Sequence, residues 1–224
     1  MSRTSQLLSR DVPLIPGHSA LLFVDTQNYN CQLDGGEYSG LPPEDVERAY
    51  GHFFATLRSI AIPNWIRLQT AFRDRKIEVL YTVIQSLTLD GRDRSLDYKI
   101  SGFHIPPNTY DARVIDAIQP GPDEIVIPKT SSSAFISTNI DYVLRNLGVA
   151  SLAIAGVLTD QCVDSTVRDA CDLGYRVTVV TDACATHTRE RHESALRNNA
   201  GYARQITTEL LVAEVVGFCA AEVQ

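Results

Sequence analysis

Cys162 occupies a position where a thiol can act as a nucleophile. It follows the apolar run Ser151–Val157, which is typical of a buried strand, and precedes an amphipathic stretch over residues 163–174, which predicts a helix ending at Gly174. Free backbone N–H groups and the dipole at the start of a helix favour an anion, so we expect them to lower the pKa of this thiol. The same N–H groups can hold an oxyanion.

Two charged residues, Asp25 and Lys129, end other apolar runs in the same way, at 19–25 and 124–129. As a catalyst, Asp25 would be the general base that takes the thiol proton, and the Lys129 ammonium would keep Asp25 ionised and favour the thiolate. Each residue type also has a structural explanation, because an aspartate can cap a turn and a cysteine is often simply buried. Cys31, in the polar segment after the first run, is an alternative nucleophile.

The elements that must position these residues follow from the hydrophobic pattern. Short apolar strands separated by helices predict a doubly wound α/β fold with a mainly parallel sheet covered by helices on both faces. Ligands of such folds bind beyond the carboxyl ends of the strands, so we expect Asp25, Lys129 and Cys162 to meet there. We expect a single domain over residues 1–224. The expected strands are 19–25, 76–84, 124–129, 151–157, 175–182 and an edge strand at 205–208, and the expected helices are 44–75 interrupted at Pro63, 139–147, 163–174 and 189–203.

One polar stretch, residues 90–107, is too long for a simple connector and is a candidate pocket loop. No Gly-x-Gly-x-x-Gly motif or P-loop follows any expected strand, which argues against a nucleotide-binding domain.

Composition narrows the class of partner. The 224 residues are 44% hydrophobic and 21% charged, and the net charge of −7 argues against nucleic acid and anionic membranes. No apolar run is long enough for a membrane span, and residues 1–10 lack the apolar core of a signal peptide, so we expect a cytoplasmic protein. The five cysteines have neither Cys-x-x-Cys pairing nor framework spacing, which argues against disulfides and structural zinc. Cys171 and Cys184 are expected to be structural, and Cys219 has no evident partner.

Several ordered motifs resemble those of the isochorismatase-like cysteine hydrolases, over residues 19 to about 210. The matching stretches are ALLFVDTQN (20–28), VIPKTSSSAF (126–135), GVLTDQCVDSTVRDA (156–170) and VTDACAT (180–186). The resemblance implies a doubly wound α/β fold, a homo-oligomer (dimer or tetramer), and a catalytic triad of Asp25, Lys129 and Cys162. It also implies a cis peptide bond between Val157 and Leu158, which would turn the Leu158 N–H toward an oxyanion, beside the N–H of Cys162.

The resemblance also narrows the reaction. Family members that hydrolyse the vinyl ether of isochorismate lack the nucleophilic cysteine, and this chain has Cys162. Nicotinamidases of the family bind a metal through an acid and nearby histidines after the second strand, but residues 85–97 contain no histidine. We therefore expect no metal and no cofactor. The chain looks more similar to hydrolases of N-carbamoylsarcosine, biuret, triuret and ureidoacrylate.

The predicted reaction is therefore hydrolysis of a small ureido or carbamoyl amide through an acyl-enzyme on Cys162. Two alternatives remain: an amidase acting on a non-ureido amide such as nicotinamide, and a non-catalytic scaffold on the same fold.

Side-chain amides suit a ureide, because it presents alternating hydrogen-bond donors and acceptors. The candidate substrate contacts are Gln27, Asn28 and Tyr29 after the first strand, Gln85 at the end of the second, and Gln205 on the last strand or from a neighbouring subunit. Each of these side chains can equally be satisfied within the fold.

Overall fold

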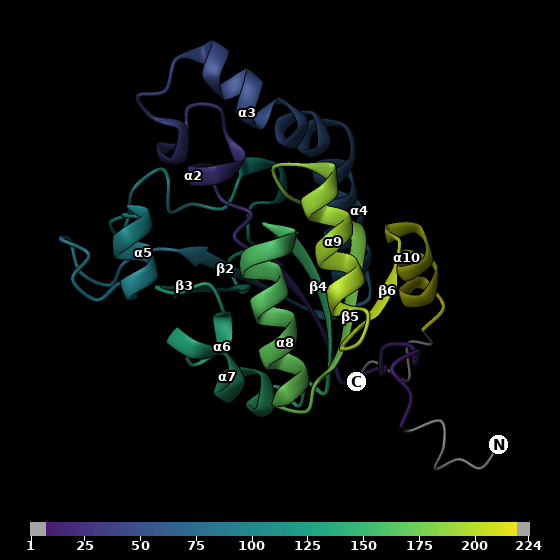
Figure 1. The fold of residues 1–224 in the computed structure, drawn as a ribbon. Helices are drawn as coiled ribbons and strands as arrows, with labels where there is room; N and C mark the ends of the chain where they lie inside the picture. The colour runs from purple at the N-terminus through teal and green to yellow at the C-terminus, as the bar shows by residue number, and fades with distance from the viewer. Residues whose placement is uncertain (1–7, 219–224) are drawn as a thin grey trace.

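A six-stranded parallel sheet forms the centre of the molecule in the computed structural model, which describes residues 8–218 (Figure 1). The strand order is β3-β2-β1-β4-β5-β6, and every neighbouring pair is parallel. From β1 the chain adds strands first on one side, β2 and β3, and then on the other side, β4 to β6. Doubly wound folds bind ligands where the order reverses in this way, beyond the carboxyl ends of β1 and β4. The predicted fold class is confirmed. The strands are β1 Ser19–Val24, β2 Glu78–Ile84, β3 Ile125–Lys129, β4 Ser151–Val157, β5 Arg176–Ala185 and β6 Arg204–Ile206.

Helices cover both faces of this sheet (Figure 1). Leu21 and Phe23 of β1 pack with α3, α4 and α10, whereas Ala20 and Leu22 pack with α7, α8 and α9. Burial on both faces explains why the central strands β1 and β4 are continuous apolar runs rather than alternating ones. The helices are α2 Asn28–Cys31, α3 Pro43–Thr56, α4 Ile62–Asp74, α5 Leu96–Ser101, α6 Ala134–Ser137, α7 Ile140–Asn146, α8 Asp164–Asp172, α9 Arg189–Asn199 and α10 Thr208–Val216, with 3-10 turns η1 Gly36–Tyr38 and η3 Asp116–Ile118 and π-helical turns η2 Leu57–Ala61 and η4 Thr159–Val163. No helix among residues 8–218 is long and apolar enough to cross a membrane.

Several predicted boundaries differ from the structure. The long helical region is not interrupted at Pro63, because this proline falls in the first turn of α4, after the π-helical turn η2, where its missing N–H is tolerated. Cys162 lies in the π-helical turn η4 and not in the first turn of α8. The strand predicted at 175–182 extends to Ala185, and the helix predicted at 189–203 ends at Asn199. The candidate pocket loop at 90–107 contains the short helix α5.

Candidate active site

The carboxyl ends of β1, β3 and β4 bring Asp25, Lys129 and Cys162 together. Lys129 Nζ lies 2.9 Å from Asp25 Oδ2 and 3.3 Å from Cys162 Sγ. The side chains of Asp25 and Lys129 have no exposed surface, and Cys162 is 5% exposed. Thr82 of β2, between β1 and β3 in the sheet, donates to Asp25 Oδ1 at 3.2 Å. The structure therefore produces the convergence expected from the sequence, while the catalytic roles of the three residues stay predictions.

Tyr98 on α5 is a fourth member of this cluster. Its hydroxyl accepts a hydrogen bond from Lys129 Nζ at 2.9 Å and lies 3.6 Å from Cys162 Sγ. Tyr98 was not among the site residues predicted from the sequence. The one available signal was its place in the long polar stretch expected to line the pocket, since a single tyrosine there has no distinguishing pattern.

Burial dominates the electrostatics of the site. It raises the pKa of Asp25 above that of an ordinary carboxyl group, although the neighbouring Lys129 ammonium opposes the shift. It raises the pKa of the Cys162 thiol to about 12, again against the attraction of Lys129. The expectation that a helix start would lower this pKa is therefore wrong, because desolvation of the buried sulfur outweighs the local dipole. The thiol is protonated at neutral pH and needs a base to become a nucleophile.

Lys129 behaves differently from its two neighbours. Burial alone would lower its pKa, but interaction with the Asp25 carboxylate, and with the acidic groups of Cys162 and Tyr98 if they ionise, raises it well above the ordinary lysine value. The ammonium also donates to the backbone carbonyl of Ser131 at 2.8 Å. Lys129 therefore remains a cation in the site.

The backbone before Cys162 has the geometry that the resemblance implied. The Val157–Leu158 peptide bond is cis. The Leu158 carbonyl accepts from the N–H groups of Gln161 at 3.0 Å and Val163 at 3.2 Å, the residues on either side of Cys162. The role of the Leu158 and Cys162 N–H groups as an oxyanion hole stays a prediction.

Gly156 explains how β4 comes so close to β1 at this point. Its φ is 131°, which L side chains rarely adopt, and a Cβ there would lie 2.1 Å from the carbonyl oxygen of Val24. Only glycine fits the end of this strand.

Helix α9 holds the turn that carries Cys162. His192 Nδ1 lies 2.9 Å from Thr159 Oγ1, and Asp160 forms an ion pair with Arg191 at 2.5 Å. Thr186, after β5, also donates to Asp160. The position of the thiol thus depends on contacts with residues far along the chain.

Three of the five predicted substrate contacts are already used within the fold. Gln27 Nε2 donates to the carbonyls of Ile84 and Asp111 at 3.0 and 2.9 Å. The Asn28 side-chain amide donates to the Tyr110 carbonyl at 3.0 Å. Gln205 donates to α9, at the Leu196 carbonyl and Asn199 Oδ1, both at 2.6 Å. These amides satisfy backbone and side-chain acceptors, so a contact with substrate stays a prediction without support from their geometry.

Tyr29 and Gln85 connect to the cluster through neighbouring groups. The Tyr29 ring packs edge-on against Phe103 with centroids 6.1 Å apart, and Phe103 packs in the same way against Tyr98 at 5.2 Å. Gln85 donates its backbone N–H to the Lys129 carbonyl at 3.1 Å, and its side chain is half-buried. Their contact with substrate also stays a prediction.

The alternative nucleophile, Cys31, contacts the backbone of Asp25. Its Sγ is 3.9 Å from the Asp25 carbonyl oxygen and 3.4 Å from Asn30 Oδ1. Burial, together with the negative charges of Glu37 and Asp25, raises the pKa of this thiol well above the ordinary value. The Asp25 carbonyl and Asn30 Oδ1 are both hydrogen-bond acceptors and cannot stabilise a negatively charged sulfur. A thiolate at Cys31 is therefore less stabilised than one at Cys162, which lies beside the Lys129 ammonium.

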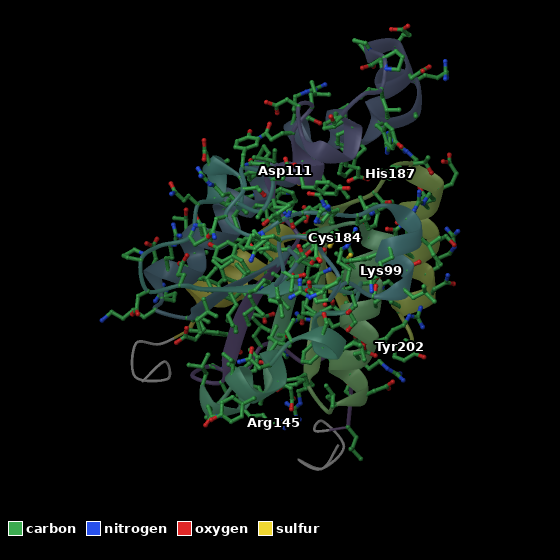
Figure 2. The ribbon with its side chains drawn as sticks, turned by 90° about the vertical axis from the view of Figure 1, so that its left-hand side faces the viewer. Lys99, Asp111, Arg145, Cys184, His187 and Tyr202 are labelled. Atoms are coloured by element: carbon green, nitrogen blue, oxygen red, sulfur yellow. The ribbon has the colours of Figure 1, made fainter. Side chains whose placement is uncertain are left out.

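The remaining cysteines do not form disulfides among residues 8–218. Cys184, labelled in Figure 2, lies in β5 and is buried, as expected for a structural residue. Cys171 is half-buried and packs against the core from α8. Cys219 lies outside the described residues.

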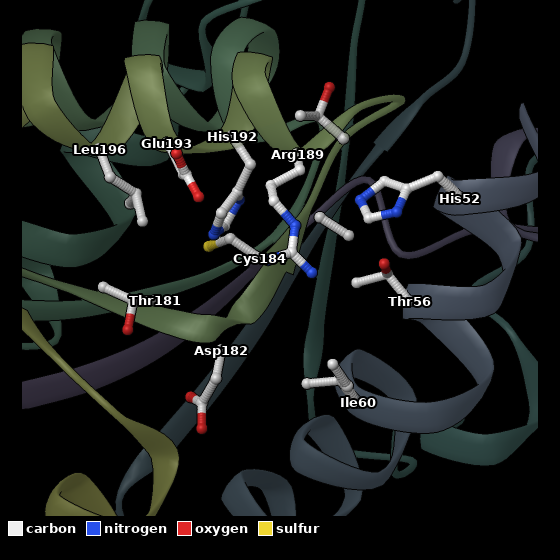
Figure 3. A pocket seen from close by; sticks show the side chains of 12 residues that line it. His52, Thr56, Ile60, Thr181, Asp182, Cys184, Arg189, His192, Glu193 and Leu196 are labelled. Carbon is white, nitrogen blue, oxygen red and sulfur yellow. The ribbon is translucent and has the colours of Figure 1, made fainter.

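A separate pocket of about 360 Å³ lies between α3, the end of β5 and α9 (Figure 3). His52, Arg189 and His192 line it, and none of the triad residues does. Within residues 8–218, no group of three or more His, Cys, Asp or Glu side chains is arranged to hold a metal ion.

Comparison with known proteins identifies a family and a named amidohydrolase similar to this chain. A family model for the isochorismatase domain matches residues 19–209. A ureidoacrylate amidohydrolase of Rhizobium rhizogenes is 39% identical over 189 residues, covering 77% of this chain and 72% of that protein.

Solved structures share the fold. A cysteine hydrolase from Pseudomonas syringae pv. phaseolicola has a TM-score of 0.76 at 21% identity, covering 92% of this chain and 98% of that one. An N-carbamoylsarcosine amidase from Thermoplasma acidophilum has a TM-score of 0.65 at 25% identity, covering 86% and 97%. The chain therefore belongs to the isochorismatase family and is a hydrolase of that family.

Proposed function

We propose that the protein hydrolyses a small ureido or carbamoyl amide, with Cys162 as the covalent nucleophile. The observation that supports this most strongly is the buried contact between Lys129 Nζ, Asp25 Oδ2 and Cys162 Sγ, at 2.9 and 3.3 Å. The relatives named for ureidoacrylate and N-carbamoylsarcosine hydrolysis support the substrate class.

In the proposed reaction, Asp25 takes the proton from the Cys162 thiol, and the thiolate attacks the carbonyl carbon of the substrate. The N–H groups of Leu158 and Cys162 stabilise the oxyanion that forms. Asp25 then gives the proton to the leaving nitrogen, and the C–N bond breaks, which releases ammonia or an amine. A water molecule, deprotonated by Asp25, hydrolyses the thiocarbamate or thioester and restores the thiol.

The electrostatics support these roles for Asp25 and Cys162. A thiol whose pKa is about 12 needs a base within the site, and the raised pKa of Asp25 makes it a stronger base than an ordinary carboxylate. Lys129 stays cationic and stabilises the negative charge as it moves from carboxylate to sulfur.

The test is ammonia release from biuret, triuret, N-carbamoyl amino acids, ureidoacrylate and nicotinamide. Wild-type protein is compared with Cys162→Ser and with Cys171→Ser, a half-buried thiol on α8 that serves as the matched control. We expect turnover of one ureide, a loss of several orders of magnitude in Cys162→Ser and wild-type rates in Cys171→Ser. Activity that survives Cys162→Ser would refute the nucleophile. Turnover of nicotinamide alone would favour the non-ureido amidase. No ammonia release from any of these substrates would favour the non-catalytic scaffold.

Two further expectations belong to this proposal. We expect a homo-oligomer, a dimer or tetramer, which light scattering coupled to size exclusion would measure. We also expect a cytoplasmic location, which fractionation of the source cells would test.

A further inference from the structure

The Tyr98 hydroxyl is held in the site by the backbone around it. Tyr98 is 1% exposed and lies on α5, whose first turn is capped by Ser95: the Tyr98 N–H donates to Ser95 Oγ at 3.2 Å. Ser95 in turn donates its N–H to the carbonyl of Thr130, the residue after Lys129, at 2.9 Å. The Tyr98 ring also faces the Lys129 ammonium, 5.5 Å from the ring centroid. The hydroxyl is therefore fixed beside the strand end that supplies Lys129.

Hydrogen bonding around Lys129 leaves the tyrosine proton available. An ammonium has three N–H donors, but Lys129 Nζ has four neighbours within reach: Asp25 Oδ2, the Ser131 carbonyl, Tyr98 Oη and Cys162 Sγ. The carboxylate and the carbonyl can only accept. When Tyr98 Oη accepts from Lys129, its own O–H proton is free to point elsewhere, and Cys162 Sγ lies 3.6 Å away.

We propose that Tyr98 is a catalytic residue whose hydroxyl donates a hydrogen bond to Cys162 Sγ as the thiolate forms. This rests on the proposed role of Cys162 as the nucleophile. Before proton transfer, the hydroxyl accepts from Lys129 and occupies one of its donors. As negative charge develops on the sulfur, Tyr98 and Lys129 both turn donors toward it, and no proton leaves the tyrosine.

Chemistry and burial favour Tyr98 as a permanent donor. Burial raises the pKa of its phenol above the ordinary tyrosine value, even though Lys129 lowers it. The group therefore keeps its proton throughout the pH range of the reaction. Without this donor, the thiolate would depend on Lys129 and on backbone N–H groups in a site that excludes most water.

The test measures the thiol directly and needs no ureide. The rate constant for iodoacetamide alkylation of Cys162 is measured at pH 8, with peptide mapping to separate Cys162 from the other cysteines. In Tyr98→Phe, which keeps the ring, we expect this rate constant to fall by about tenfold, since a hydrogen bond to a charged group is lost. Tyr175→Phe, a buried tyrosine whose hydroxyl bonds to Asp141 on α7, is the matched control and should behave as wild type.

A second variant tests the same hydrogen bond without removing the hydroxyl, in case Tyr98→Phe disturbs folding. Fluorotyrosine placed at position 98 by nonsense suppression keeps the hydroxyl and the shape but makes it a stronger donor, so the alkylation rate constant at pH 8 should rise. An unchanged rate constant in both variants would overturn the proposal, and so would a loss of kcat with an unchanged alkylation rate constant, because Tyr98 would then only support the fold. A changed alkylation rate constant without turnover of any ureide would contradict the proposed substrate class and leave this role of Tyr98 intact.

Discussion

Replacing Lys129 with methionine tests the electrostatic account of the site. The substitution keeps most of the side-chain volume and removes the ammonium that lies 2.9 Å from Asp25, where neither side chain has exposed surface. Removing one partner of a buried ion pair costs about 3–5 kcal/mol, because the other charge is left buried and unpaired. Asp25 can avoid this cost by holding a proton, and its raised pKa already favours that form.

The loss in free energy of unfolding depends on pH, because Asp25 in the variant either holds a proton or keeps a buried, unpaired charge. Keeping a carboxyl group of ordinary pKa near 4 protonated costs about 1.4 kcal/mol for each pH unit above that value, or roughly 2 kcal/mol at pH 5.5 and more than 5 kcal/mol at pH 8. At pH 8 the limit is therefore the buried charge itself, about 3–5 kcal/mol. In the variant, the folded state holds a proton that the unfolded chain releases, so stability falls as pH rises. For Lys129→Met we expect the free energy of unfolding to fall by about 2 kcal/mol at pH 5.5 and by about 4 kcal/mol at pH 8.

Urea unfolding at both pH values measures this loss, and the larger value corresponds to a fall in Tm of roughly 8–16 °C. Lys99→Met, at an exposed lysine on α5 near the molecular surface (Figure 2), is the control and should change stability little at either pH. The double variant with Asp25→Asn should recover much of the loss at pH 8, because no charge is then buried. A loss below about 1 kcal/mol that is equal at both pH values would refute the reasoning.

Two further predictions concern stability. Gly156→Ala places a Cβ 2.1 Å from the Val24 carbonyl at a φ of 131°, so we expect a loss of more than about 3 kcal/mol in urea unfolding, and a wild-type midpoint would contradict the close approach of β1 and β4. Burial raises the pKa of Glu37 to about 7, so this carboxyl group is harder to ionise in the folded protein than in the unfolded chain. The free energy of unfolding therefore falls as pH rises from about 4 to 7. Glu37→Gln should therefore raise the free energy of unfolding at pH 8 and change it much less at pH 4, whereas an equal effect at both would show that Glu37 is not held protonated.

The elements of the fold were largely predictable because their signals are local. The runs that became β1 and β4 are continuous and apolar, as buried parallel strands require, and they are followed by Asp25 and Cys162, while Lys129 ends β3. The helix interruption expected at Pro63 was wrong. Pro63 looked like an interruption, yet the π-helical turn before it lets the helical path continue to Asp74.

The candidate site was predictable in part. Asp25, Lys129 and Cys162 were identifiable from their places at strand ends, where parallel strands bring side chains to one edge of the sheet. Tyr98 was not, because α5 belongs to a long connection whose path depends on contacts such as that between Ser95 and Thr130. In the sequence, the amides of Gln27 and Asn28 were candidate substrate contacts or satisfied side chains, and acceptors far along the chain, at Ile84 and Tyr110, show that they are satisfied within the fold.

The sequence by itself determined that Asp25, Lys129 and Cys162 meet, because each ends or follows an apolar run and parallel strands bring such residues to one edge of the sheet. Only the tertiary structure decided how those residues behave. The Cys162 thiol shows the difference: its place before a helix predicts a lowered pKa, and its burial at the end of the sheet raises that pKa to about 12. Desolvation depends on every segment that covers the sulfur, including α5 with Tyr98, and no local pattern contains that information.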